Sequence, residues 1–216
     1  MKKIALILSG CGHRDGAEVT EAVSLLIALH QHGAQVSCFA PNLNFETIDH
    51  ITGERTGQQR NILTEAARIA RGKVQDLKEL KTKDFDGLAF SGGLGVTHHL
   101  SDWNLLGSEC KIHPHVALVI KEFHQQSKPI GAVCIAPVLI AKVLGAEGVE
   151  LTVGSNSKTA QEIAKTGSQH VECPVNDYVT DRVAKVITTP AYMLEAQPHE
   201  VFKGISGLAK ELVEMA

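Results

Sequence analysis

The chain has 216 residues, of which 44% are hydrophobic and 21% are charged, and its formal net charge at pH 7 is -3. This is the composition of an ordinary globular protein that can bury a sizeable core. The weakly negative charge provides no basic surface for phosphate backbones, so we expect no nucleic-acid partner. No apolar run approaches the roughly 18 residues of a membrane-spanning helix. We therefore expect no membrane partner and a cytoplasmic location.

Short, continuously apolar segments alternate along the chain with segments of helical period. This alternation is typical of a mostly parallel sheet covered by helices on both faces. The expected strands are residues 4–8, 36–39, 87–90, 130–133, 151–153 and 183–187. The expected helices are residues 17–32, 60–71, 114–126, 135–144, 159–165 and 198–215. We predict one domain, residues 1–216, with a three-layer α/β sandwich fold.

In the first expected helix, Gly33 supplies the end, and the residues expected on its apolar face are Val19, Val23, Leu26, Ile27 and Leu29. Residues 41–81 are long for one connection and carry their own helical pattern. We interpret this segment as an elaboration on the sheet.

Three loops rich in reactive or flexible residues follow expected strands. They are residues 9–18, 91–95 and 134–137. In an open parallel sheet, ligands bind beyond the carboxyl ends of the strands, where such loops converge. We expect these three loops to form the functional site.

Cys134 lies where an apolar strand meets the first turn of a helix that contains Pro137. A cysteine at a helix N-terminus is favoured as thiolate by the partial positive charge of the backbone amides. Such a strand-to-helix turn also exposes the side chain, as in a nucleophile elbow. The alternative is that Cys134 is a small, buried hydrophobic residue, which is the usual role of a free cysteine. The local pattern leaves both interpretations open.

Paired glycines, Gly92 and Gly93, follow the expected strand 87–90. Glycine lets main-chain N–H groups approach a ligand closely. Their amides, together with the amide of Ile135, are candidates for an oxyanion hole and substrate-binding site. The alternative is a plain tight turn.

The first loop has the spacing Gly10-x-Gly12-x-x-x-Gly16, which is close to a dinucleotide fingerprint. No acid for a ribose follows Phe39, and Glu18 would place a carboxylate near the pyrophosphate, so a nucleotide is disfavoured. Glu18 is predicted instead to share a proton with the thiol, provided that burial raises its pKa. The alternative role for Glu18 is to complement the helix dipole.

Further candidates lie on the same loop. His13 is the histidine expected nearest to Cys134, and Cys11 is a second thiol that is expected to border the pocket. A redox role for Cys11 would require bonding reach of Cys134. The five cysteines are dispersed without Cys-x-x-Cys spacing, and no carboxylates accompany the histidine pairs at ligand spacing. We expect no metal site. We expect His98 and His99, which follow the glycine loop, to lie on the solvated surface; the alternative is a position at the pocket rim.

Several motifs along nearly the whole chain resemble those of one known family. They are LSGCG at 8–12 with DG at 15–16, ITGE at 51–54, RNIL at 60–63 with EAAR at 65–68, LGSEC at 106–110, CIAP at 134–137 and TTPAYM at 188–193. The motifs resemble the PfpI/ThiJ superfamily, with its class I glutamine amidotransferase-like, flavodoxin-like fold. Within it they resemble the ElbB branch of glyoxalase-like proteins, a branch named for isoprenoid biosynthesis.

The resemblance implies that Cys134 is the elbow nucleophile, that Glu18 is the acid contacting it, and that the amides of Gly93 and Ile135 stabilise the oxyanion. The implied activity is a cofactor-independent glyoxalase, a lyase that converts 2-oxoaldehydes such as glyoxal to 2-hydroxy acids such as glycolate. Related proteins are also described as deglycases, and the same aldehyde chemistry would be seen as deglycase activity. The resemblance further implies a homodimer.

Alternatives remain beside this activity. Ile135 follows Cys134, and residues 151–157 contain no histidine, so the base that glutamine hydrolysis needs is missing. An ammonia-producing subunit is therefore disfavoured. The main alternative is a non-catalytic redox-sensing or stress-protective protein in which Cys134 is oxidised reversibly.

Overall fold

The computed structural model describes residues 1–155 and 157–216. Its centre is a seven-stranded sheet in the order β10-β11-β7-β6-β1-β2-β5. Neighbouring strands are parallel, except that β10 and β11 are antiparallel. The strands of this sheet are β1 (Lys3–Ile7), β2 (Gln35–Ala40), β5 (Val74–Asp76), β6 (Gly87–Phe90), β7 (Ile130–Val133), β10 (Val179–Asp181) and β11 (Val186–Thr189). The mostly parallel sheet predicted from the alternating pattern is confirmed.

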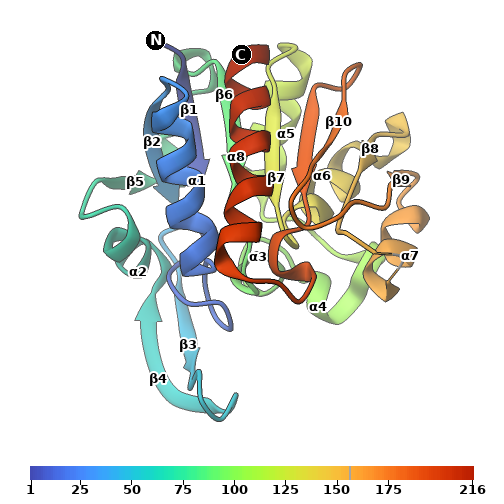
Figure 1. The fold of residues 1–216 in the computed structure, drawn as a ribbon. Helices are drawn as coiled ribbons and strands as arrows, with labels where there is room; N and C mark the ends of the chain where they lie inside the picture. The colour runs from blue at the N-terminus through green and yellow to red at the C-terminus, as the bar shows by residue number, and fades with distance from the viewer. Residues whose placement is uncertain (156) are drawn as a thin grey trace.

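Helices cover both faces of this sheet. On one face, α1 (Val19–Gln31) and α8 (Pro198–Met215) pack side by side, as Figure 1 shows. On the other face, α5 (Pro114–Gln125) packs on β6, on β7 and against α6 (Pro137–Leu144). The central strands are fully buried between the two helical layers, which explains their continuously apolar sequences. The predicted three-layer sandwich is confirmed.

The remaining elements are short and lie around this core. The α-helices among them are α2 (Ile62–Ile69), α3 (Gly95–His98), α4 (Trp103–Leu106) and α7 (Lys158–Lys165). The strands are β3 (Asn44–Ile48), β4 (Arg55–Asn61), β8 (Glu150–Leu151) and β9 (Gln169–His170). The 3-10 turns are Leu77–Glu79, Thr82–Asp84, Gly107–Glu109, Gly145–Glu147 and Ala191–Met193. Among the described residues, no helix combines the length and apolarity needed to cross a membrane.

The elaboration expected in residues 41–81 is present. It contains an antiparallel hairpin, β3 and β4, that projects below the sheet in Figure 1, followed by α2. Two strand predictions need correction. The strand expected at 151–153 is β8, which pairs with β9 in a separate small sheet. The strand expected at 183–187 begins later because Lys185, at φ 54°, belongs to the turn between β10 and β11.

The predicted apolar face of α1 is also wrong in part. Val19, Val23 and Ile27 are 42%, 39% and 46% exposed. The helix instead buries a face of mostly small or polar residues, namely Glu21, Ala22, Ser24, Leu25, Ala28 and Leu29. A prediction based on apolar residues gives no weight to small or polar residues that pack closely. It therefore assigned the outer side of α1, which carries the larger apolar side chains, to the core. A carboxylate, Glu21, therefore points into the molecule.

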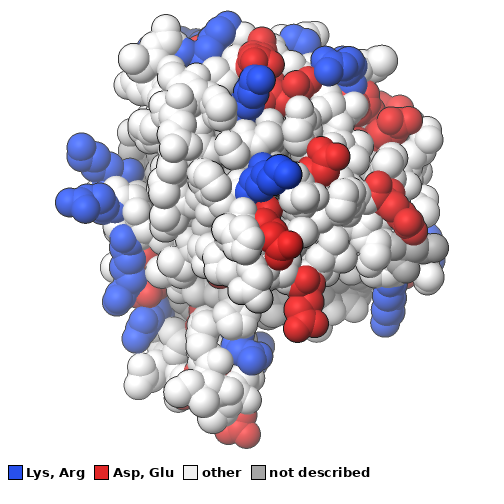
Figure 2. Space-filling model, viewed as in Figure 1, with Lys and Arg blue, Asp and Glu red and all other residues white. Residues whose placement is uncertain are grey.

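Charges of both signs occur on the face shown in Figure 2. Lysine and arginine side chains gather mainly along the left edge, while aspartate and glutamate lie mainly over the centre and right. Uncharged surface separates these regions. The charged groups on this face therefore form no single continuous basic surface.

Candidate active site

Cys134 follows β7 in a strained turn, as predicted. Its φ is 63°, a left-handed backbone conformation that residues other than glycine seldom adopt. The Cys134 amide donates to the carbonyl of Thr189 at 2.9 Å, and α6 begins three residues later at Pro137. The residue keeps 8% of its surface exposed. This geometry is that of a nucleophile elbow at the carboxyl end of the sheet.

The glycine pair after β6 closes on this elbow. A Cβ added at Gly92 would overlap both the Glu21 Oε2 atom and the Cys134 Cβ, and it would lie 3.1 Å from the Cys134 Sγ. Only glycine therefore lets the acid and the thiol meet at this point. The amides of Gly93 and Ile135 both hydrogen-bond toward the Cys134 sulfur. The structure thus brings together Cys134, Gly92, Gly93 and Ile135, but around a different acid from the one expected.

Glu21, on the first turn of α1, is the carboxyl that contacts the thiol. It is fully buried, and its Oε1 accepts a hydrogen bond from the Tyr192 amide at 3.1 Å. Burial raises the pKa of Glu21 to about 8, and the Glu18 charge adds to the shift. The Tyr192 amide, the Cys134 thiol and the nearby Gly92 amide act in the opposite direction. At neutral pH the Glu21 carboxyl is therefore mainly protonated.

The prediction that Glu18 contacts the thiol is wrong. Glu18 is the N-cap residue of α1, and its Oε2 accepts from the Glu21 amide at 2.7 Å. Its own amide donates to the Gly92 carbonyl at 3.0 Å. The physical reason is that α1 begins at Val19 rather than at residue 17, so the Glu18 side chain turns back to satisfy a free helix N–H. The acid that faces the sheet lies one turn further along.

A sequence signal for Glu21 did exist. Glu21 lies four and seven residues before Leu25 and Ala28, on the same side of the helix. A carboxyl at such a position must be buried, and buried carboxyls are expected at functional sites. The signal was missed because the opposite face of α1 has the larger apolar side chains.

Burial also changes the prediction for the thiol. It raises the pKa of Cys134 well above its ordinary value, and Glu21 adds to the rise when it is ionised. The amides of Gly93 and Ile135 lower it, which is the effect expected from a helix N-terminus. Desolvation of the sulfur is the larger of these effects. Formation of the thiolate therefore requires either a group that accepts the thiol proton or a hydrogen bond to the sulfur from the neutral Glu21 acid.

Cys11 and His13 lie elsewhere. Cys11 lines a cavity of about 410 Å³ beneath the β3–β4 hairpin, and Cys134 is not among the residues lining this cavity. All five cysteines are free thiols. Burial, followed by the charge of Glu65, raises the pKa of Cys11. His13 is exposed, and its ring packs edge-on against His50 with ring centres 5.0 Å apart. Neither residue contacts Cys134 through any interaction recorded for the described part of the chain.

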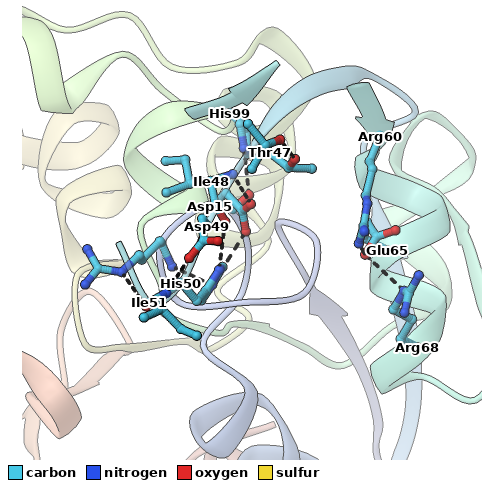
Figure 3. A network of polar contacts seen from close by, with 12 residues as sticks. Asp15, Thr47, Ile48, Asp49, His50, Ile51, Arg60, Glu65, Arg68 and His99 are labelled. Carbon is cyan, nitrogen blue, oxygen red and sulfur yellow. Dashed lines mark hydrogen bonds and ion pairs between the residues drawn. The ribbon is translucent and has the colours of Figure 1, made fainter. Parts of the chain in front are cut away.

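Several residues that line this cavity belong to a polar network, whose contacts are drawn in Figure 3. The buried Asp15 carboxylate accepts from the Ile48 amide at 2.8 Å and lies 3.7 Å from the His50 Nε2. At the other side, Glu65 forms ion pairs of 3.3 and 3.0 Å with Arg60 and Arg68. These contacts join the hairpin to the first loop and to α2. Their evident role is to hold the elaboration on the sheet.

Other histidines have structural contacts. His99 is half-buried, packs on Phe45, and donates to the Asp15 carbonyl at 2.9 Å, so the expectation of a solvated position is wrong for it. Near His199, Glu200 completes a capping box with Gln197 at the start of α8. Within residues 1–155 and 157–216, no group of three or more His, Cys, Asp or Glu side chains is placed to hold a metal ion.

The layered parallel sheet and the strained cysteine elbow define an α/β protein of the class I glutamine amidotransferase-like type. Residues 2–195 match the model of the DJ-1/PfpI family, and the chain belongs to this family. The superfamily resemblance stated from the loop motifs is therefore confirmed at this level.

Relatives match along almost the whole chain. The human glutamine amidotransferase-like class 1 domain-containing protein 3, mitochondrial, is 43% identical over 99% of this chain and 83% of its own length. The rat ES1 protein homolog, mitochondrial, is 41% identical over 99% of this chain and 84% of its own. The cytoplasmic location expected from the sequence is contradicted by these relatives, whose names place them in mitochondria.

Solved structures show the same fold. An isoprenoid biosynthesis protein with an amidotransferase-like domain from Ehrlichia chaffeensis superposes with a TM-score of 0.93 at 39% identity, over 100% of this chain and 99% of that one. Drosophila melanogaster DJ-1beta superposes with a TM-score of 0.58 at 19% identity, over 99% and 95% of the two chains. The second likeness concerns the fold alone.

Proposed function

We propose that this protein is a cofactor-independent, cysteine-dependent glyoxalase of the ElbB branch, acting on small 2-oxoaldehydes such as glyoxal. The observation that supports this most is the meeting of the Cys134 Sγ and the Glu21 Oε2 against Gly92, inside a strained elbow. The likeness to the Ehrlichia chaffeensis protein supports the choice of branch. A buried acid of raised pKa is suited to moving protons near neutral pH.

The proposed reaction begins with addition of the Cys134 thiolate to an aldehyde carbon, which forms a C–S bond and moves the carbonyl electron pair onto oxygen. Glu21 protonates this oxygen and becomes the carboxylate, giving a hemithioacetal. The amides of Gly93 and Ile135 stabilise the oxyanion before it is protonated.

Glu21 carboxylate then removes the proton from the sulfur-bearing carbon, and the electrons move onto the neighbouring carbonyl oxygen to give an enediolate. Glu21 returns this proton to the neighbouring carbon, and the hydroxyl proton of the sulfur-bearing carbon passes to the neighbouring oxygen, which gives the thioester of a 2-hydroxy acid. One carbon has been oxidised and its neighbour reduced, so no external oxidant or reductant is required. Water hydrolyses the thioester, which releases glycolate when glyoxal is the substrate and restores the thiol.

A second candidate function is redox sensing or stress protection through oxidation of Cys134. The 8% exposure of Cys134 supports it, because peroxide needs less space around sulfur than an aldehyde with its hydration shell. The first oxidation product would be a sulfenic acid, formed when the thiolate displaces water from peroxide.

The test is glyoxal consumption and glycolate formation, followed by NMR with purified protein. We expect stoichiometric glycolate from the wild type, none from Cys134→Ser, and wild-type rates from the control Cys11→Ser, whose thiol lines a different cavity. Full activity of Cys134→Ser would refute the nucleophile. Oxidation of Cys134 at low peroxide without any aldehyde turnover would support the redox function instead.

A further inference from the structure

The end of β11 and the turn that follows it form one hydrogen bond to each member of the reactive pair. The Thr189 carbonyl accepts from the Cys134 amide at 2.9 Å. Three residues later, the Tyr192 amide donates to the Glu21 Oε1 at 3.1 Å. A single short segment therefore contacts both the backbone of the nucleophile and the side chain of the acid.

The backbone of this turn is strained. Ala191 has a φ of 45°, its side chain is fully buried, and it begins a 3-10 turn that ends at Met193. Such conformations persist only where the surrounding structure holds them, and they concentrate at functional sites. In this chain the strained residue lies directly before the amide that contacts Glu21.

The position of this amide has a chemical consequence for a neutral carboxylic acid. Such an acid has one carbonyl oxygen, which is its better acceptor, and one hydroxyl oxygen, which donates its hydrogen. Because the Tyr192 N–H occupies Oε1, the acid hydrogen belongs on Oε2. The Gly92 amide is also near this carboxyl. Among the described residues, however, no donor meets hydrogen-bond geometry at Oε2, which shares the space beside Gly92 with the Cys134 Sγ.

We infer that Tyr192 is a positioning residue, whose backbone amide selects the protonated oxygen of Glu21 and directs the acid hydrogen at the Cys134 sulfur. The inference rests on the proposed function of the pair and adds which atom holds the proton. The N–H, the carboxyl and the sulfur then form a chain of hydrogen bonds in which each bond strengthens the next. Loss of the amide should therefore destabilise the Cys134 thiolate.

Few other titratable groups face this pair. Glu18, on the same helix, raises the pKa of Glu21 through its charge. The Tyr192 hydroxyl interacts with the Thr20 side chain, and burial raises its pKa. Variants at residue 192 must therefore distinguish the effect of the backbone amide on the reactive pair from the effect of the tyrosine ring.

Tyr192→Pro removes the N–H, and Tyr192→Ala removes the ring but keeps the N–H. The measurement is the pH dependence of Cys134 alkylation by iodoacetamide, followed by peptide mass spectrometry. Relative to Tyr192→Ala, we expect the Tyr192→Pro profile to move upward by about one pH unit. Alkylation would then be about tenfold slower on the rising limb. Coincident profiles of the two folded variants would overturn the inference.

A second substitution covers the case in which Tyr192→Pro does not fold. Cys173 permits ligation of a synthetic segment of residues 173–216, in which the Tyr192 amide is replaced by an ester. An ester at Ala191 is the control, because the Ala191 amide donates no hydrogen bond recorded in the described part of the chain. The upward shift is expected for the Tyr192 ester alone, and equal profiles of the two esters would overturn the inference. Absence of glyoxal turnover in the wild type would refute the proposed function while leaving this comparison of thiol reactivity intact.

Discussion

At the scale of single residues, the pair formed by Glu21 and Cys134 decides what the site can do. Glu21→Gln keeps the size of the side chain and removes its proton. We expect glyoxal turnover to fall by roughly 100-fold or more, the usual loss when a general acid–base group is removed. The control is Glu18→Gln, which changes the N-cap and should retain most of the activity. If Glu18→Gln forms less glycolate than Glu21→Gln, then Glu18 is the catalytic acid, as expected from the sequence.

Glu21 also makes stability depend on pH. Its folded pKa of about 8 lies above its ordinary value of 4.5, so the neutral form is favoured in the folded state. The contribution is therefore fully present below about pH 4.5 and is lost as the pH rises toward 8, at up to about 1.4 kcal/mol per unit. We expect the difference in unfolding free energy between wild type and Glu21→Gln to fall by a few kcal/mol from pH 5 to 8. Urea denaturation of both proteins at each pH measures it, and a constant difference would contradict the assignment.

At the scale of elements, the turn after β6 brings the acid and thiol together. Gly92→Ala places a Cβ in the space occupied by Glu21 and Cys134. We expect loss of glyoxal turnover and destabilisation of about 1–3 kcal/mol, the usual cost of overpacking. Gly57→Ala is the control, because no atom lies within 4 Å of the added Cβ. Its φ of 74° strains alanine, whereas Gly92 is not among the glycines of positive φ, so a larger loss in Gly92→Ala reports the close contacts. Equal activity of the two variants would show that close approach at Gly92 is unnecessary.

The same scale shows where sequence patterns succeed and fail. Strands β6 and β7 and helix α8 match their predicted bounds because each carries a continuous apolar run or a regular amphipathic pattern. The inward face of α1 was predicted wrongly because small side chains, not large ones, pack there. The β3–β4 hairpin was not predicted as strands, since β4 is mostly exposed and polar and lacks an apolar face.

At the scale of the whole molecule, we expect a homodimer. The stripe of Val19, Val23 and Ile27 along the outer side of α1 is apolar and exposed, as an association surface requires. Sedimentation velocity should give twice the mass of one chain for the wild type and the mass of one chain for Val23→Glu. Lys210→Glu is the control for added negative charge on a surface residue of α8. A monomeric wild type, or a Val23→Glu dimer, would exclude this face as the interface.

The sequence by itself determined the layered parallel fold, the elbow at Cys134 and the glycine turn at Gly92, because strand and turn signals are local properties of the chain. Only the tertiary structure decided which carboxyl meets the sulfur. The N-cap bond of Glu18 and the packing of α1 turn Glu21 inward, and both depend on where the helix begins and which side it buries. The Tyr192 amide reaches Glu21 from 171 positions away in the chain, a contact that no local pattern encodes.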